Sequence, residues 1–318
     1  MVGWLGAGDY RNLQISPNHP AILTIQLFPC YSSRMRHGFL LVNKPTGPTS
    51  HDIVAIVRRV LPEMHIGHLG TLDPAAEGLL VLAVGAKALK VVELFKGLPK
   101  AYEAEVHLGA VSTTYDREGM ITETPAKPGW EMPEPAAVQR LLNEKFTGKI
   151  AQVPPAASAI KIGGERAYRK MRQGRAVDLP PRDVTITECT LVTYTHPDVR
   201  LFVRCGSGTY IRSLAHDFGA ALRIGAYLSG LRRTEVGEWK LQNAVAPERA
   251  RWTDVLPLKE VLKSFPGIIV SVQEAKDLSF GKNIAREVVS NTVAWHEDLP
   301  IAILEPTEDG KAHGRKVL

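Results

Sequence analysis

The sequence predicts a mixed α+β fold with a small, separate unit at its C-terminal end. Strand and helix patterns alternate irregularly along most of the chain, without the repeating strand–helix–strand order of a parallel sheet. A cluster of prolines, Pro247, Pro257 and Pro266, then marks a change in composition. After it, short strand patterns and tight turns such as Asp309-Gly310 predominate, which is typical of a compact unit built from strands.

The elements before the proline cluster follow from their periodicity. An apolar run over 79–84 predicts a buried strand, and the polar–apolar alternation over 102–108 predicts a half-buried one. Thr49 or Ser50 can cap a helix whose apolar face continues to Leu61. The expected strands cover 39–42, 79–84, 102–108, 184–194, 200–205 and 227–236, and the expected helices cover 50–61, 86–98, 136–146 and 210–222.

Composition limits the classes of function. Lys and Arg outnumber Asp and Glu by 39 to 33, and the net charge of +6 is compatible either with a polyanionic partner or with a slightly basic soluble enzyme. The three cysteines are widely spaced and form no C-x-x-C pair, so neither a zinc knuckle nor a disulfide framework is expected. This cysteine usage fits an intracellular, reducing compartment, so we expect a cytoplasmic protein. No membrane partner is expected, because no apolar stretch approaches the ~20 residues of a membrane span.

Residues 1–34 differ from the rest of the chain. They mix glycine and proline without periodicity, and they lack the basic-then-apolar order of a secretory signal. The first clear strand pattern begins directly after Met35. We interpret residues 1–34 as a disordered extension, or as the result of a start codon assigned too far upstream.

The strongest candidate for chemistry is Asp73, in the segment Gly67-His-Leu-Gly-Thr-Leu-Asp-Pro74. Asp before Pro is by itself a common turn element. Here, however, Gly67, Gly70 and Gly78 surround Asp73 and allow close approach of the backbone, where a simple strand entry needs fewer glycines. Since an aspartate at the mouth of a buried strand can be aimed into a cleft, we expect Asp73 to be catalytic.

Later residues can serve this carboxylate. Tyr102 is by default a half-buried aromatic residue at the start of a strand, but its ring could also stack on a nucleobase. Arg212, in the first turn of a helix, is by default a surface ion-pair residue, but its guanidinium could also keep a carboxylate fixed and ionised. His65 and His68 lack a third ligand for zinc, so no metal is expected. We interpret His68 as a wall of the cleft around Asp73.

A basic stretch over 161–175 begins with Lys161 and includes Tyr168. Such a stretch is usually a solvated surface, but a projecting basic loop with an aromatic residue also suits nucleic-acid contact. The chain lacks the G-x-x-x-x-G-K-[ST] loop, the G-x-S-x-G elbow and the H-x-E…P-C-x-x-C pattern. Nucleoside-triphosphate, α/β-hydrolase and zinc-deaminase chemistry are therefore not expected.

Several motifs, taken in order, resemble those of the bacterial tRNA pseudouridine-55 synthases of the TruB family. The resemblance runs from Met35 to about Val245. It rests on Met35-Arg-His-Gly-Phe-Leu-Leu-Val-Asn-Lys-Pro-Thr-Gly47, Gly67-His-Leu-Gly-Thr-Leu-Asp-Pro74, Lys100-Ala-Tyr102, Gln152-Val-Pro-Pro155 with Ser158-Ala-Ile-Lys161, Gly208-Thr-Tyr-Ile-Arg212 and Leu231-Arg-Arg233. Glu77 departs from the pattern, since the family more often has a small hydroxyl residue there, and residues 1–34 have no counterpart.

The resemblance implies roles for single residues. Asp73 would be the catalytic aspartate, Tyr102 would stack on the substrate base, and Arg212 would pair with Asp73. The residues that it assigns to substrate binding are His68, Tyr210, Leu231 and Lys161. It also implies a catalytic domain over 35–255 with a mixed, largely antiparallel sheet and an RNA-gripping insertion over 125–180, followed by a PUA-like RNA-binding domain over 265–318.

The activity implied is the conversion of uridine 55 in the tRNA T-loop to pseudouridine. The base would be flipped out, cleaved from its ribose and rejoined through C5. No cofactor is implied, and the expected partner is the T-arm of tRNA, bound by a monomer without a guide RNA. Two alternatives stay open, a catalytically silent tRNA-binding or tRNA-folding module and a guide-RNA-dependent synthase of the dyskerin type. Intact Asp73, Tyr102 and Arg212 disfavour the first, and the lack of a long basic tail disfavours the second.

Overall fold

The computed structural model describes residues 37–158, 161–162, 164–173, 175 and 179–318. The chain divides into a unit of residues 1–34 and a unit of residues 35–318. The first unit lies outside the described residues. Our interpretation of residues 1–34 as an extension therefore stays a prediction.

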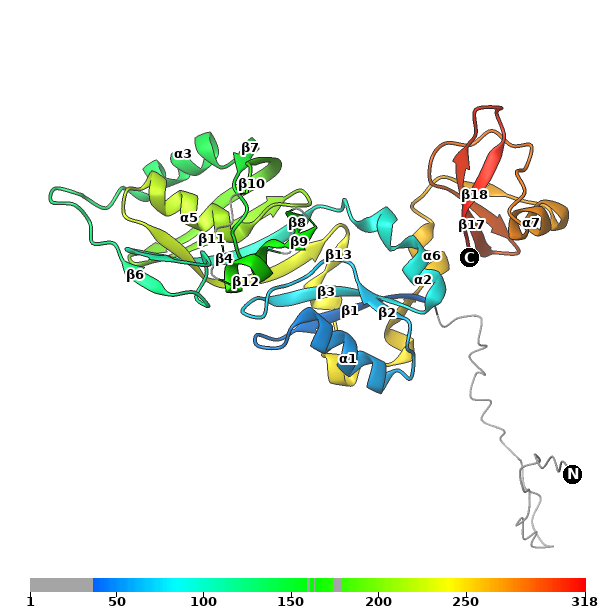
Figure 1. Ribbon diagram of the computed structural model, residues 1–318, viewed down its shortest axis with the longest axis horizontal. Helices are drawn as coiled ribbons and strands as arrows, with labels where there is room; N and C mark the ends of the chain where they lie inside the picture. Colours follow the sequence, from blue (N-terminus) through cyan, green and yellow to red (C-terminus); the bar gives the residue numbers. More distant parts are fainter. Residues whose placement is uncertain (1–36, 159–160, 163, 174, 176–178) are drawn as a thin grey trace, which may run out of the picture. The chain divides into compact units, whose positions relative to one another are not determined.

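The second unit is built around a sheet of ten strands. These are β1 (Gly38–Lys44), β2 (Ile66–His68), β3 (Glu77–Val84), β4 (Lys100–Leu108), β7 (Gly148–Gln152), β10 (Arg182–Thr195), β11 (Asp198–Cys205), β12 (Ala226–Val236), β13 (Trp239–Lys240) and β14 (Val255–Pro257). Their order is β14-β1-β3-β12-β4-β11-β10-β7, with β2 on β3 and β13 on β12 (Figure 1). Only the pair β12–β3 is parallel, so the mixed, largely antiparallel sheet is confirmed.

The parallel pair joins the two halves of this sheet. Arg233 of β12 lies opposite Gly78 of β3 on one side and opposite Tyr102 of β4 on the other. Gly78 has a φ of +101°, and a Cβ added to it would lie 2.4 Å from the Arg233 carbonyl oxygen. Only glycine fits there, because a side chain would push the strands apart just after the Asp73 turn.

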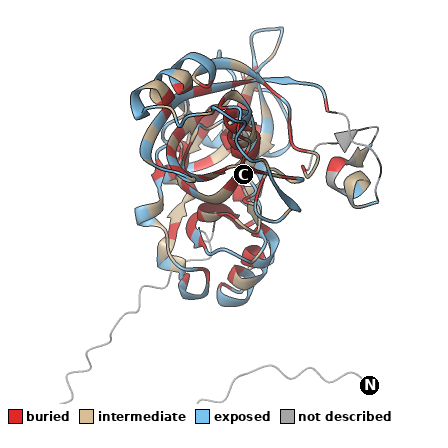
Figure 2. Ribbon diagram, turned by 90° about the vertical axis from the view of Figure 1, so that its left-hand side faces the viewer, coloured by how far each residue is buried: buried red, intermediate tan, exposed pale blue. Residues whose placement is uncertain are grey.

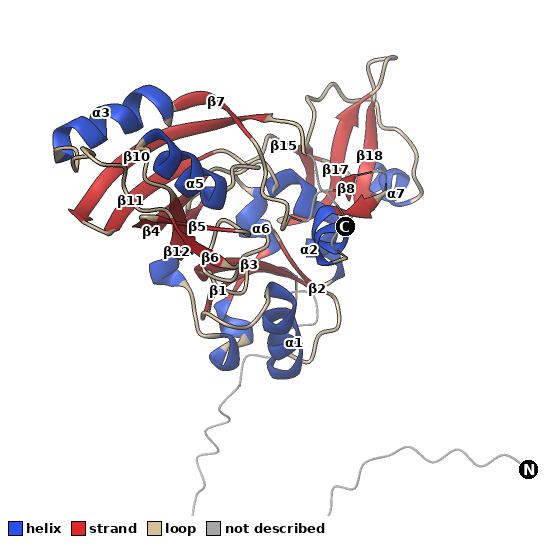
Figure 3. Cartoon of the chain, turned by 60° about the vertical axis from the view of Figure 1, so that its left-hand side comes forward, coloured by secondary structure: helices blue, strands red, loops and turns tan. Residues whose placement is uncertain are grey.

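Helices cover the sheet on both of its faces. They are α1 (Ser50–Val60), α2 (Ala86–Val91), α3 (Pro135–Lys145), α5 (Ile211–Ala221) and α6 (Leu258–Leu262), with single 3₁₀ turns η2 (Val92–Phe95), η3 (Leu241–Asn243), η4 (Pro247–Arg249) and η5 (Trp252–Asp254). Helix α4 (Ala167–Arg172) lies apart from them, beside a short strand of a separate two-stranded sheet. Helices α3 and α5 lie beside β10, β11 and β4, whereas α1 lies beside β1 and β3 (Figures 1 and 3). Figure 2 shows the buried residues gathered along the strands and the helix sides that face them.

Strand β3 is buried on both faces, which explains its unbroken apolar sequence. Leu80 and Leu82 pack in the cluster that contains Ile53 of α1. Leu79 and Val81 pack on the other face, in a cluster that includes Val261 of α6 together with residues of α2. A buried strand of this kind is a fixed platform for the turn that leads into it.

The sequence leaves open whether Thr49 or Ser50 caps helix α1, and the structure identifies Thr49. Thr49 is the N-cap, since its Oγ1 accepts a hydrogen bond from the Asp52 amide at 3.1 Å while the Asp52 carboxylate accepts one from the Thr49 amide at 2.8 Å. Ser50 is buried, and its hydroxyl bonds to the backbone of Leu72 in the Asp73 turn. The predicted helix over 86–98 is shorter than expected, because α2 ends at Val91 and continues as the 3₁₀ turn η2.

The C-terminal residues form a second sheet of four strands, β15 (Gly267–Ile269), β16 (Thr292–His296), β17 (Leu299–Pro306) and β18 (Ala312–Val317), in that order. The Asp309-Gly310 turn connects β17 to β18, and Gly310 has a φ of +73°. The small β-rich unit is therefore confirmed. The structure adds helix α7 (Val272–Ser279), which the sequence analysis did not predict although Ser271 and Glu274 form a capping box there. Its PUA-like character stays a prediction.

Candidate active site

A cavity of approximately 270 Å³ brings together segments that are far apart in sequence. Its walls come from the Thr71–Asp73 turn, β4, residues 157–158, the start of α5 and β12. The predicted site residues that line it are Asp73, Tyr102, Tyr210, Arg212 and Leu231. The fold therefore gathers in one hollow most of the residues that the sequence singles out.

Arg212 and Asp73 meet at the edge of this cavity. Tyr210 is the N-cap residue of α5, which places Arg212 in the first turn of the helix. The Arg212 Nε lies 3.1 Å from the Asp73 Oδ2, and the two side chains are 8% and 42% exposed. The carboxylate is thus open to the cavity while the cation that fixes it is buried behind it.

Arg212 is also held by groups that the sequence analysis did not identify. Its Nη1 lies 3.3 Å from the Oδ2 of Asp116, whose side chain is 7% exposed. Nη1 also donates to the Thr114 carbonyl at 3.2 Å, and Nη2 donates to the Ala157 carbonyl at 3.0 Å. With partners on all three nitrogens, the plane of the guanidinium is fixed, and so is the side that it offers to Asp73.

Asp116 lies in the turn between β5 (Ala110–Ser112) and β6 (Ile121–Glu123). Its Oδ1 accepts hydrogen bonds from the Thr114 hydroxyl at 2.5 Å and from the Glu118 amide at 3.0 Å. The polar run before Gly119 is a usable signal for a turn. Nothing in that run indicates that its aspartate reaches an arginine almost a hundred residues later, because the contact depends on the packing of α5.

The turn that carries Asp73 is anchored by buried polar side chains. Lys44 of β1 is 0% exposed and donates from Nζ to the carbonyls of Ala76 at 2.6 Å and Pro74 at 3.3 Å. Burial lowers the pKa of Lys44, and the nearby Asp73 carboxylate opposes this shift. Ser50 accepts from the Leu72 amide and donates to the Leu72 carbonyl, both at 2.9 Å. The backbone on either side of Asp73 is therefore held from β1 and α1.

Two predicted site residues do not line the cavity as the structure describes it. The ring of His68, at the end of β2, packs edge to face against His51 with centroids 5.4 Å apart. Burial lowers the pKa of His68, and the charge of His51 adds to this effect. Lys161 begins β8 (Lys161–Ile162), which pairs with β9 (Glu165–Arg166), and its side chain lies outside the described part. Their assignment to substrate binding stays a prediction.

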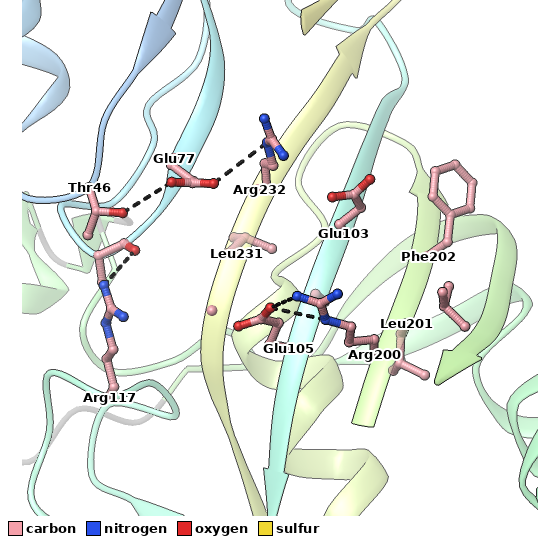
Figure 4. Close-up of a pocket in the computed structure, with 14 residues that line it drawn as sticks. Thr46, Glu77, Glu103, Glu105, Arg117, Arg200, Leu201, Phe202, Leu231 and Arg232 are labelled. Atoms are coloured by element: carbon pink, nitrogen blue, oxygen red, sulfur yellow. Dashed lines mark hydrogen bonds and ion pairs between the residues drawn. The ribbon is translucent and has the colours of Figure 1, made fainter. Parts of the chain in front are cut away.

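A larger hollow of approximately 410 Å³ lies over the other face of the sheet. Successive residues of a strand point to opposite faces, so Glu103 lines this groove while its neighbour Tyr102 lines the cavity. Figure 4 shows two ion pairs in it, Glu105 with Arg200 at 2.5 Å and Glu77 with Arg232 at 3.6 Å, whereas Glu103 is drawn without a partner. Asp73 does not line this groove. We therefore look for the chemistry in the smaller cavity, where Asp73 is accessible.

Metal and membrane features can be checked in the same residues. Within the part of the chain that the structure describes, no three His, Cys, Asp or Glu side chains are grouped so that they could hold a metal ion. Among the same residues, no helix is long and apolar enough to cross a membrane.

The amino-acid sequence matches a known protein family. The family described as TruB family pseudouridylate synthase (N terminal domain) matches residues 58–211. The tRNA pseudouridine synthase B of Thermobifida fusca is 42% identical over 261 residues, which cover 79% of this chain and 87% of that protein. The protein of the same name from Corynebacterium diphtheriae is 40% identical, with 77% and 83% covered.

Solved structures agree in fold. A Cbf5-Nop10-Gar1 complex contains a chain that matches with a TM-score of 0.65 and 23% identity over 90% of this chain and 85% of that one. An H/ACA ribonucleoprotein bound to a substrate RNA containing 2'-deoxyuridine matches with a TM-score of 0.64 and 22% identity over 89% and 86%. By the identity and coverage of its bacterial relatives, the chain belongs to the TruB family of pseudouridylate synthases.

Proposed function

We propose that this protein converts uridine 55 in the T-loop of tRNA to pseudouridine. The observation that carries the proposal is the Asp73–Arg212 ion pair of 3.1 Å at the edge of a cavity that Tyr102 also lines. Bacterial relatives that bear the name tRNA pseudouridine synthase B support the same reaction.

The chemistry needs an ionised carboxylate beside a flipped base. The reaction breaks the bond between ribose and N1 of uracil and forms a new one to C5. C5 loses its proton and N1 gains one, so the product is an isomer of the substrate and no cofactor is required. Asp73 would attack the substrate or promote cleavage of the glycosidic bond, and Arg212 would keep the carboxylate charged and aimed. The cavity of approximately 270 Å³ is slightly smaller than the ~300–1,000 Å³ of common ligand sites, which suits one base.

The cavity walls suggest how the base is held. Tyr102 would stack on one face of the extruded uracil, and Leu231 would supply an apolar wall. Extruding a base costs a few kcal/mol of unstacking, which contacts to the folded T-arm would offset. The insertion over 125–180 and the C-terminal unit over 265–318 would make such contacts. We place the reaction in the cytoplasm, on a monomer.

Incubation with an unmodified tRNA transcript, followed by mapping of pseudouridine, tests the proposal. We expect modification at position 55, none in a transcript that carries cytidine there, and conversion of an isolated T stem-loop at nearly the rate of whole tRNA. Binding should weaken as salt rises, since phosphate contacts release counterions. Absence of pseudouridine would favour a silent tRNA-binding module, and a requirement for added guide RNA would favour a dyskerin-type synthase.

A truncation tests the interpretation of residues 1–34. We expect a chain that starts at Met35 to keep the activity and the melting temperature of the full chain, because the removed segment has no core pattern. A large loss of either would show that the segment is an integral element.

A further inference from the structure

Arg233 is a buried cation that has no acidic partner among the residues that the structure describes. Its side chain lies in the interior, with the residue 2% exposed, and no carboxylate of the described residues forms an ion pair with it. Removing a charge from water is costly unless hydrogen bonds replace its hydration. An apolar side chain at this position would avoid the free-energy cost of desolvating a charge. The buried arginine is therefore expected to have a specific role.

The guanidinium of Arg233 binds the backbone on both sides of Asp73. Its Nη2 donates to the carbonyl of Gly70 at 3.0 Å, and its Nη1 lies 3.4 Å from the carbonyl of Thr71. Its Nε donates to the carbonyl of Leu79 at 2.7 Å. One planar group therefore connects the entry of the Asp73 turn to the strand that follows it.

The same residue reaches the other half of the site. Arg233 and Tyr102 are directly opposite each other on β12 and β4. Burial raises the pKa of the Tyr102 hydroxyl, and the positive charge of the nearby Arg233 opposes this rise. Arg233 thus bonds to the turn that carries the carboxylate and lies opposite, on the neighbouring strand, the tyrosine that lines the cavity.

We propose that Arg233 is a positioning residue that fixes the spacing between Asp73 and the Tyr102 ring. The proposal rests on the function proposed above for these two residues. Lysine cannot replace the arginine, because one ammonium group cannot donate in a fixed plane to these three carbonyls. Catalysis is sensitive to such spacing, since a displacement of about 1 Å can lower a rate by about 100-fold.

Arg232 provides a matched control. It is the next residue of β12, its side chain is 48% exposed, and it pairs with Glu77 at 3.6 Å. The same substitutions at positions 232 and 233 therefore compare an exposed arginine with a buried one on the same strand.

The test measures single-turnover rate, tRNA affinity and thermal unfolding in the full chain, for Arg233→Lys, Arg233→Met, Arg232→Lys and Arg232→Met. We expect Arg233→Lys to stay folded and to bind tRNA as the wild type does, with a rate lowered by about 100-fold. Arg233→Met should be slower still, and both variants at 232 should match the wild type. Equal rates for Arg233→Lys and the wild type, or loss of fold in both variants at 233, would overturn the proposal.

A second measurement separates positioning from a purely structural role. Tyr102→Phe removes the hydroxyl and keeps the ring, so a double-mutant cycle with Arg233→Lys measures their coupling. We expect Arg233→Lys to slow the Tyr102→Phe enzyme less than it slows the wild type. Effects that simply multiply would contradict the proposed link. If instead the wild type makes no pseudouridine, the proposed function fails and the positioning proposal with it.

Discussion

The Asp73 turn and the groove on the opposite face of the sheet use arginine in different ways. Around the turn, Arg212 and Arg233 are buried and bind backbone carbonyls. In the groove, Arg200 and Arg232 are exposed and pair with glutamates, and Arg117 makes an exposed bond to the Ala75 carbonyl at 3.3 Å. Exposed pairs contribute little to stability, whereas burying a cation is costly. In this protein, the two buried arginines thus lie where they fix the backbone around Asp73, the proposed catalytic residue.

Among the residues that support Asp73, the largest effect should follow substitution of Arg212. Lysine keeps the charge but loses the fork that contacts Asp73, Asp116 and two carbonyls. We expect the single-turnover rate of Arg212→Lys to fall by about 100- to 1,000-fold, as when one preorganised donor is lost, with unchanged tRNA affinity. A wild-type rate in this variant would place Arg212 among the structural arginines, like those of the groove.

Asp116→Asn should have a smaller effect on rate and a clear effect on stability. The amide keeps the shape of the side chain but removes the charge beside a buried guanidinium, and a charged hydrogen bond contributes about 1.5–3 kcal/mol. We expect a loss of stability in this range by urea unfolding, and a rate between those of the wild type and Arg212→Lys. Unchanged stability would mean that Asp73 alone satisfies Arg212.

Lys44→Met tests the anchoring of the turn through pH. Because burial holds the pKa of Lys44 below 10.5, the unfolded chain binds more protons between the folded-state pKa and 10.5. The free energy of unfolding should therefore rise with pH in that window in the wild type, and this rise should be smaller in Lys44→Met. At neutral pH we expect the variant to be less stable by about 2 kcal/mol, since the carbonyls of the turn lose a donor. Parallel pH profiles would contradict the buried position of Lys44.

The smallest effect should come from the groove. Glu105→Gln removes one member of an exposed pair with Arg200 and leaves the Asp73 turn untouched. We expect the melting temperature, the rate and the tRNA affinity to match those of the wild type. A marked loss of tRNA affinity would show that the groove binds substrate, and the contrast between the two regions would then be wrong.

The sequence was informative where residue type and local pattern determine structure. The glycines around Asp73, the apolar run of β3 and the capping residues of α1 each have a local physical cause. Asp116 and Arg233 could not be predicted, because their partners are contributed by segments that only the packed sheet brings together. Helix α7 was missed for a different reason, since it is short and only Leu278 among its residues is buried, which leaves a weak apolar period.

The proposed role of Asp73 is tested most directly by Asp73→Asn, measured for tRNA binding and for pseudouridine formation in the same preparation. Asparagine keeps the shape of the side chain and removes its charge, so the turn and its anchors at Lys44 and Ser50 should be unaffected. We predict tRNA affinity equal to that of the wild type and pseudouridine formation at background. Appreciable turnover by the purified variant would contradict the assignment of Asp73 as the catalytic carboxylate.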